Sequence, residues 1–195
     1  KINDIKFFGN EKFSERFLLN KVFTKVKKNK FIIFKGKFKE VDLEEDIENL
    51  YNFYNINGYR DFTVNKKDVR FENNGIVIYI DISEGNQNYY RDFIFNGNFK
   101  FTDEELLDVL ALQKGDLYNK EKFDFSVFNL NSKYYDEGYY FLDNTYQIQP
   151  SLQDSIDIHF NIIENNETKV RKILISGNNK TNDNVIRREL KIFPG

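Results

Sequence analysis

Residue types that carry out catalysis or bind metals are scarce in this sequence of 195 residues. It contains no cysteine, which excludes disulfides, thiolate metal sites and cysteine nucleophiles. His159 is the single histidine, so no second imidazole can join it in a zinc site or an acid–base pair. We therefore predict that His159 is a surface residue, that the protein is not an enzyme, and that it needs no metal or cofactor.

The carboxylates of Asp42, Glu45 and Asp46 are the nearest approach to an acid–base cluster. Their spacing also matches a capping box, in which Asp42 begins a helix and Glu45 bonds back to its first turn, and we prefer this interpretation. No glycine-rich phosphate loop or nucleophile elbow is present in the sequence. With 29 basic and 31 acidic residues, it also lacks the basic excess of a nucleic-acid-binding protein, so we expect no nucleic-acid partner.

The sequence repeats itself at a distance of 80 residues. The recurring residues include Gly58 with Gly138, Tyr59 with Tyr139, Glu84 with Glu164, and Gly97-Asn98 with Gly177-Asn178. Many matches at one offset are typical of tandem copies of one structural module. An earlier Gly9-Asn10 lies 88 residues before Gly97, so the first copy contains eight extra residues.

Two helices are predicted in each copy. Residues that favour helix N-caps follow each Gly-Asn pair, namely Ser14, Thr102 and Asn182, and Thr102 forms a full capping box with Glu105. A second helix follows, for which Asn119 is the cap in copy two. Its apolar residues fall on one helical face: Leu43, Ile47, Leu50 and Tyr54 in copy one. Gly58 and Gly138 then provide the left-handed stop at which these helices end.

A β-hairpin follows the second helix. A strand from Phe62 to Phe71 leads into a turn at Asn73 and Asn74, and the return strand alternates from Ile76 to Ile82. In copy two, Ile156, Ile158, Phe160 and Ile162 are expected to face inward, and Asp157, His159 and Asn161 outward. The predicted class is α+β. Each module is β-α-α-β-β, with a three-stranded mixed sheet covered on one face by two helices and the return strand in the middle.

These patterns divide the chain into modules at residues 1–85 and 89–166 and the start of a further module at 170–195. The short joins predict modules that touch. Ile173 and Ile175 are expected to form an opening strand, held against copy two or the edge of another chain. Lys1 stands where an initiator methionine would, so we expect a segment of a longer protein, and no apolar run approaches the ~20 residues that cross a bilayer.

These motifs resemble the POTRA domains of the outer-membrane barrel-assembly (BamA) family over the whole chain. The residues that carry the resemblance are Tyr54, Gly58-Tyr59, Ile82-Ser83-Glu84-Gly85, Gly97-Asn98, and the run from Arg171 through Gly177-Asn178 to Leu190. On that resemblance, the copies look like the third and fourth POTRA domains and the start of the fifth. Asn165 departs from the pattern, since it replaces the glycine of Glu-Gly.

The resemblance implies a periplasmic location at the bacterial outer membrane. It implies unfolded outer-membrane protein chains and accessory lipoproteins of the assembly complex as partners, with membrane contact only through a C-terminal barrel absent from this sequence. A structural spacer that binds no client stays an alternative. So does the POTRA region of a two-partner secretion or translocation-assembly relative.

The first strand of each hairpin is the predicted binding site, because an edge strand can pair with an added strand. We expect these edges at residues 60–71 and 140–149. The candidate residues are Arg60, Phe62, Val64, Lys66, Val69 and Phe71 in copy one, and Tyr140, Leu142, Thr145 and Ile148 in copy two. Alternatively, the edges are only protected, since Lys66, Lys67, Asp68 and Pro150 are residues that blunt edges.

A lysine-rich segment at residues 25–39 surrounds an apolar centre. It could dock an acidic partner or lipid headgroups through Lys28, Phe31, Ile33 and Phe34. A solvated loop whose apolar centre packs on its own module is the preferred interpretation, because charged runs in loops are usually solvated.

Overall fold

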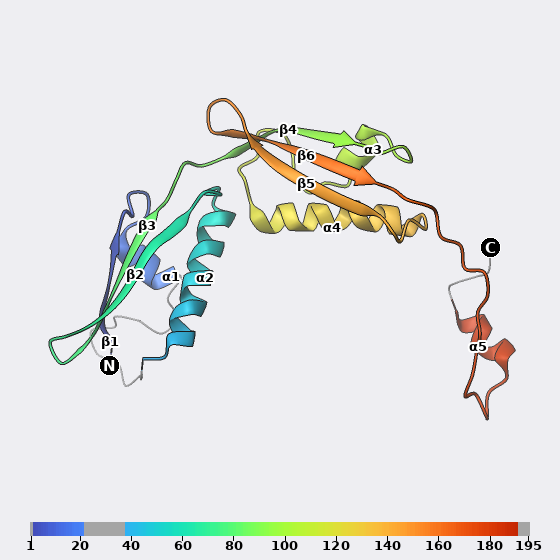
Figure 1. Ribbon diagram of the computed structural model, residues 1–195, viewed down its shortest axis with the longest axis horizontal. Coiled ribbons are helices and arrows are strands. Elements are labelled where there is room, and N and C mark those ends of the chain that lie inside the picture. Colours follow the sequence, from blue (N-terminus) through green and yellow to red (C-terminus); the bar gives the residue numbers. More distant parts are fainter. Residues whose placement is uncertain (1, 22–37, 191–195) are drawn as a thin grey trace.

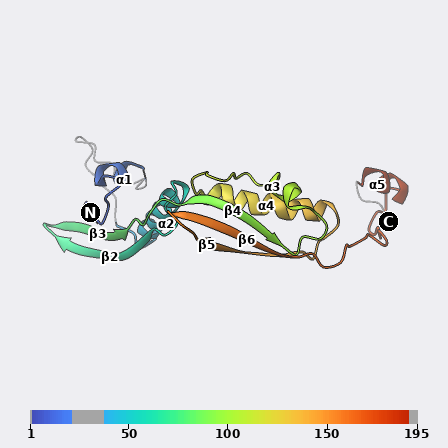
Figure 2. The same ribbon diagram turned by 90° about the horizontal axis from the view of Figure 1, so that it is seen from above.

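The computed structural model describes residues 2–21 and 38–190. The first module, in chain order, consists of β1 (Ile2–Phe8), α1 (Glu15–Lys21), α2 (Glu40–Ile56), β2 (Thr63–Glu72) and β3 (Gly75–Ser83). The second module consists of β4 (Tyr89–Asn96), α3 (Asp103–Leu107), α4 (Lys120–Asp136), β5 (Asp143–Pro150) and β6 (Ser155–Ile163). A short helix, α5 (Asp183–Glu189), follows. The modules succeed one another along an elongated molecule (Figures 1 and 2).

The described strands form two separate three-stranded sheets with the same topology, in the orders β1-β3-β2 and β4-β6-β5. In each sheet the opening strand runs parallel to the return strand, and the first hairpin strand runs antiparallel to it. The predicted α+β class, the mixed sheet and the central return strand are therefore confirmed. Because the return strands β3 and β6 are central and apolar, their inward-facing side chains form one side of each core.

Each module has its own apolar core between the sheet and its two helices. The predicted stripe of α2 is confirmed, because Leu43, Ile47, Leu50 and Tyr54 are all buried. In the second module the long helix α4 runs along one face of the sheet (Figure 1). Helices of 17 residues such as α2 and α4 bury one stripe and expose the other, which leaves their outer faces available to solvent.

Most of the predicted helix caps are present. Thr102 and Glu105 form the reciprocal capping box of α3, and the Asn119 side chain accepts a hydrogen bond from the Lys122 N–H. The prediction for Asp42 is wrong, because α2 begins two residues earlier at Glu40 and places Asp42 inside its first turn. Acidic residues in a first turn still interact favourably with the helix dipole, which accounts for the sequence signal.

The Gly-Asn turns bring the chain close to the end of the central strand. Gly97 has a φ of 82°, and a Cβ at this position would collide with the carbonyl oxygen of Ile162. The Asn98 side chain donates to the carbonyl of Phe101 at 3.0 Å and so closes the turn. Gly9 and Asn10 repeat both features, so this repeated dipeptide is explained by backbone geometry.

The hairpin turn is confirmed at Asn73 and Asn74, whose φ angles of 50° and 60° suit a tight two-residue turn. Asn165 also adopts a positive φ of 55°, close to the 70° of Gly85. Asparagine tolerates this left-handed region better than other non-glycine residues, so the departure at Asn165 leaves the local backbone conformation unchanged.

The sheet faces that turn away from the helices are less exposed to solvent than predicted. Asp157 was expected to face solvent, but it is buried where the Arg91 guanidinium donates to both of its carboxylate oxygens. Val77, which holds the equivalent position on β3 80 residues earlier, is buried as well. The Arg91 guanidinium thus satisfies both oxygens of the Asp157 carboxylate, an interaction that a periodicity argument does not anticipate.

The two modules meet through backbone and side-chain hydrogen bonds. The Asn88 N–H donates to the Gly58 carbonyl at 2.9 Å, and the Tyr118 N–H donates to the Asn88 carbonyl at 2.8 Å. The Asn119 side chain donates to the Ile56 carbonyl at 3.1 Å. The last turn of α2 is thereby joined to the start of α4, and the prediction that the modules touch is confirmed.

The prediction of an opening strand at Ile173 and Ile175 is wrong, since the structure has no strand between residues 164 and 182. Within the described part of the chain, the hydrogen bonds and ion pairs of residues 172–190 are all made inside that segment, such as Arg187 donating to the Ile173 carbonyl. A strand needs a partner for its backbone groups, and the described residues supply none here.

Candidate functional site

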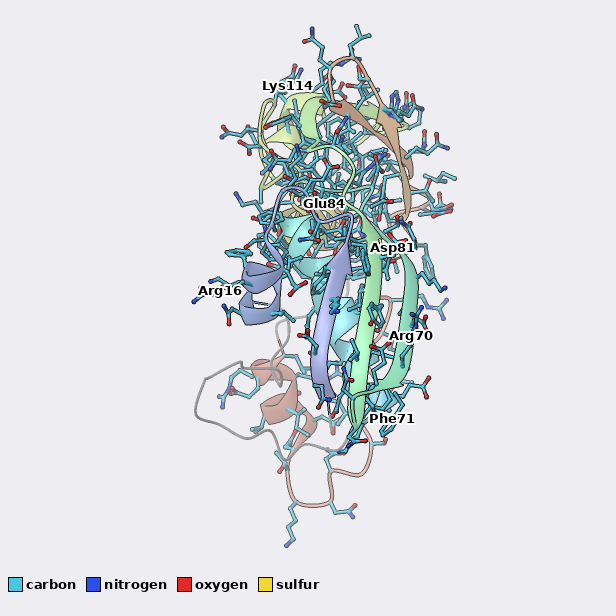
Figure 3. The ribbon with its side chains drawn as sticks, turned by 90° about the vertical axis from the view of Figure 1, so that its left-hand side faces the viewer. Arg16, Arg70, Phe71, Asp81, Glu84 and Lys114 are labelled. Atoms are coloured by element: carbon cyan, nitrogen blue, oxygen red, sulfur yellow. The ribbon has the colours of Figure 1, made fainter. Side chains whose placement is uncertain are left out.

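The candidate site is one of the two edges of each sheet, the edge formed by β2 in the first module and by β5 in the second. In the part of the chain that the structure describes, β2 pairs with β3 alone and β5 with β6 alone. Figure 3 shows Arg70 and Phe71 on β2, with Phe71 toward the hairpin end of the sheet. An edge strand presents N–H and C=O groups that an added extended segment can pair with.

Four of the predicted edge residues lie before the strands. Arg60 and Phe62 precede β2, which begins at Thr63, and Tyr140 and Leu142 precede β5, which begins at Asp143. Phe62 is only 3% exposed and stacks on Tyr54 with ring centroids 4.0 Å apart. The chain needs these residues to turn from the helix into the sheet, so they belong to the core and the turn rather than to the edge.

The beginning of β2 is partly covered. The Val64 N–H donates to the Tyr51 hydroxyl at 3.0 Å, and a β-bulge follows, because Asn65 has no partner in the register between Val64 and Lys66. A bulge interrupts the regular ladder of an edge. The part of β2 that can accept a regular strand therefore runs from Lys66 toward Glu72.

Charged side chains line this part of β2. Lys67 pairs with Glu44 of α2, and the Arg70 guanidinium bonds to Asp68 at 2.7 Å and lies over the Tyr79 ring. The hydrogen bond from Arg70 holds the pKa of Asp68 below its ordinary value. Lys66 is exposed beside these pairs. Such charges disfavour the edge-to-edge pairing of two whole sheets more than the binding of a single extended segment.

Apolar side chains are also exposed on the two edges. Val69 and Phe71 of β2 are exposed, Phe71 to 77%. On β5, Thr145 is exposed, Ile148 is half-buried, and the exposed Tyr146 packs against Phe123. The part of β5 between Asp143 and Pro150 carries no charged residue, so its edge is less protected than that of β2.

The remaining sequence predictions concern His159, metal binding, the lysine-rich segment and membrane-spanning helices. His159 is half-buried on β6, opposite Ile94 and Gln147. The described residues contain no group of three or more His, Cys, Asp or Glu side chains that could hold a metal ion. The candidate docking residues Lys28, Phe31, Ile33 and Phe34 lie outside the described residues. Among the described helices, none is long and apolar enough to cross a membrane.

A buried carboxylate is the residue that sequence reasoning left unexplained. Glu84 accepts hydrogen bonds from the Tyr54 hydroxyl at 2.7 Å and from the N–H groups of Glu11 and Lys12. Burial and the neighbouring Glu84 raise the pKa of Tyr54 above its ordinary value. The recurrence of Glu84 as Glu164 was the available signal, and its role is to hold the Gly-Asn turn onto the second helix.

The chain is similar to known proteins over its whole length. Residues 1–85 and 88–165 match the POTRA family, described as a surface antigen variable number repeat. The outer membrane protein assembly factor BamA of Buchnera aphidicola is 30% identical over 202 residues, which cover 100% of this chain and 32% of that protein. BamA of Neisseria meningitidis serogroup B is 27% identical over 98% of this chain and 25% of its own length. This chain thus spans about a third or less of these relatives.

Solved structures show the same fold. The crystal structure of Haemophilus influenzae BamA POTRA3-5 matches with a TM-score of 0.69 at 21% identity, covering 100% of this chain and 78% of that one. BamA from Haemophilus ducreyi lacking POTRA domains 1-3 matches with a TM-score of 0.62 at 17% identity, over 86% of this chain and 29% of that one. With its repeated β-α-α-β-β modules and the family match over both of them, the chain belongs to the POTRA family.

Proposed function

We propose that this chain is part of the periplasmic POTRA array of an outer-membrane β-barrel assembly protein. In this proposal, residues 1–85 and 89–166 are two complete POTRA modules and residues 170–195 begin a third. The similarity to BamA assembly factors supports the proposal. The array binds unfolded outer-membrane protein segments and accessory lipoproteins, and it acts without enzymatic chemistry.

The observation that carries the proposal is the strand order, which leaves β2 and β5 at sheet edges. An incoming segment would add as a further strand and pair through its main chain, so many different sequences could bind. Each hydrogen bond contributes about 0.5–1.5 kcal/mol, and ordering the segment opposes binding. The resulting affinity is weak, which suits the transfer of a client from one protein to the next.

An extended peptide and two N-methylated versions of the same peptide test this proposal. A peptide that adds to the edge pairs with it through the N–H groups of every second peptide residue. N-methylation of the residues that face the edge removes these hydrogen bonds, whereas N-methylation of the residues in between leaves them intact. We expect NMR shifts confined to residues 66–72 and 143–149 with the unmodified peptide. One methylated peptide should lose binding, and the other should keep it.

A structural spacer is the second candidate function. Its support comes from the hydrogen bonds that join the modules and from the charges that protect β2. Unchanged spectra with all three peptides would favour the spacer. Equal binding by the two methylated peptides would show recognition through side chains and overturn strand addition.

A further inference from the structure

An aromatic stripe on the outer face of α4 distinguishes the second module from the first. Phe125, Phe128 and Tyr135 are exposed, Phe125 to 55% and Phe128 to 64%. With Ser132 they are spaced along one helical face over about 15 Å. A row of exposed aromatic side chains costs solubility, so it calls for a reason outside the fold of the module.

The first module shows that the fold does not require this stripe. The equivalent positions of α2, 80 residues earlier, are Glu45, Glu48, Asn52 and Asn55. The alignment is secure, because Tyr54 and Tyr134 are both fully buried and bond to Glu84 and Glu164 respectively. The same helix in the same architecture therefore carries polar residues in one copy and aromatic residues in the other.

The aromatic packing beside the stripe is also different in the two modules. In the first module Phe13, Phe17 and Phe53 pack together, with the Phe13 and Phe53 ring centroids 4.9 Å apart. Phe101 is the counterpart of Phe13, and the position of Phe53 is taken by Lys133, whose Nζ lies 4.6 Å from the Phe101 ring centroid. The cluster of three rings is not repeated.

At this place the second module has a groove of about 600 Å³. Its lining includes Phe101, Asp108, Phe128, Lys133, Asp136 and Glu137. Phe128 belongs to both the groove and the aromatic stripe, so the two form one continuous surface. We call this surface the α4 face.

The charges of the α4 face indicate what can occupy it. Three carboxylates line the groove against one ammonium group, and Glu137 is already paired with Lys100. Among the described residues, Asp108 and Asp136 have no ion-pair partner. A cation on a long apolar stem fits such a groove, because its stem packs on Phe128 while its charge meets the carboxylates.

We propose that the α4 face binds a basic amphipathic helix of a partner protein. A straight stripe along a helix is complementary to another helix, whose apolar residues pack between the aromatic side chains. An arginine or lysine at the border of its apolar face enters the groove between Phe128, Asp108 and Asp136. The same carboxylates disfavour an anionic membrane surface, which is why a protein helix is the favoured occupant.

The test uses the full chain and a designed amphipathic helix of leucine and arginine. We expect saturable binding in an NMR titration, with shifts on the α4 face. The paired variant Phe125→Glu/Phe128→Glu introduces the residues that the first module carries, and it should weaken binding roughly tenfold or more. This change adds negative charge, so a purely electrostatic complex would bind more tightly instead.

Matched variants and probes complete the experiment. Asp108→Asn/Asp136→Asn should weaken binding of the arginine helix, whereas Glu45→Ala/Glu48→Ala on the first module should leave it unchanged. An amide spectrum that is unaltered away from the substituted residues shows that each variant is folded. Equal binding of a helix with glutamate in place of arginine would overturn the proposal. Retained affinity of the double glutamate variant, or Phe125- and Phe128-dependent binding to anionic lipid vesicles in place of the helix, would overturn it as well.

Discussion

At the scale of single residues, the Tyr–Glu pair joins three parts of each module. In the first module the Glu84 carboxylate is buried and bonds to α2 and to the turn that follows β1. In the second module Tyr134 donates to Glu164 at 3.0 Å, but Glu164 is only half-buried. The same interaction therefore lies in two different environments, which makes the two modules a natural comparison.

Tyr54→Phe should destabilise the first module by about 1–3 kcal/mol, because it leaves one oxygen of a buried carboxylate without a donor. Tyr134→Phe should cost the second module less, since water can reach Glu164. Native-state amide hydrogen exchange reports each module separately and can measure both losses. Equal losses in the two modules would show that burial of the carboxylate does not set the cost.

At the scale of elements, the turn after each opening strand limits how the sheet ends. A Cβ on Gly97 would meet the backbone of β6, whereas Gly115, with a φ of 87°, has no heavy atom within 4 Å of the same position. Gly115→Ala should therefore cost only the ~1–2 kcal/mol of a left-handed alanine. Gly97→Ala should cost clearly more, because β4 or β6 must also move. The midpoint of thermal unfolding of the two variants measures the difference, and similar midpoints would contradict the close approach.

Elements were also the scale at which sequence reasoning was most successful. The repeat, the periodic stripe of α2 and the Asn-Asn turn predicted the modules and the central position of the return strand. The starts of β2 and β5 were placed too early, because aromatic residues such as Phe62 look like strand residues whether they pair or pack. Asp157 was misplaced for a different reason, since its burial depends on Arg91, a residue far away in the sequence. Of the two proposed binding surfaces, the sequence predicted the β2 and β5 edges, but the α4 face required knowledge of which aromatic side chains remain exposed.

At the scale of the whole molecule, the contact between the modules decides whether they move together. Leu117 of the second module packs against Gly58, where a Cβ would lie 2.6 Å from a Leu117 methyl carbon. Together with the hydrogen bonds of Asn88 and Asn119, this contact resists rotation of one module against the other. These contacts therefore help to set the orientation of the β2 edge relative to the β5 edge.

Leu117→Ala should loosen this contact without unfolding either module. We expect the rotational correlation times of the two modules, measured by 15N relaxation, to become more different from one another than in the parent chain. Phe99→Ala is the control, because Phe99 is 92% exposed and its removal should leave the tumbling unchanged. Identical relaxation in the parent and in Leu117→Ala would mean that the hydrogen bonds suffice to hold the modules.

The bond between the Asn88 N–H and the Gly58 carbonyl has a counterpart 80 residues later, where the Thr168 N–H donates to the Gly138 carbonyl at 2.8 Å. Each copy thus encodes its own connector, made of its helix-ending glycine and the chain that leaves its sheet. Duplication of a gene segment that carries such a connector lengthens the array without requiring a new kind of contact between modules. Tandem growth by duplication is therefore open to this architecture, and divergence of exposed surfaces can then give each copy its own binding partner.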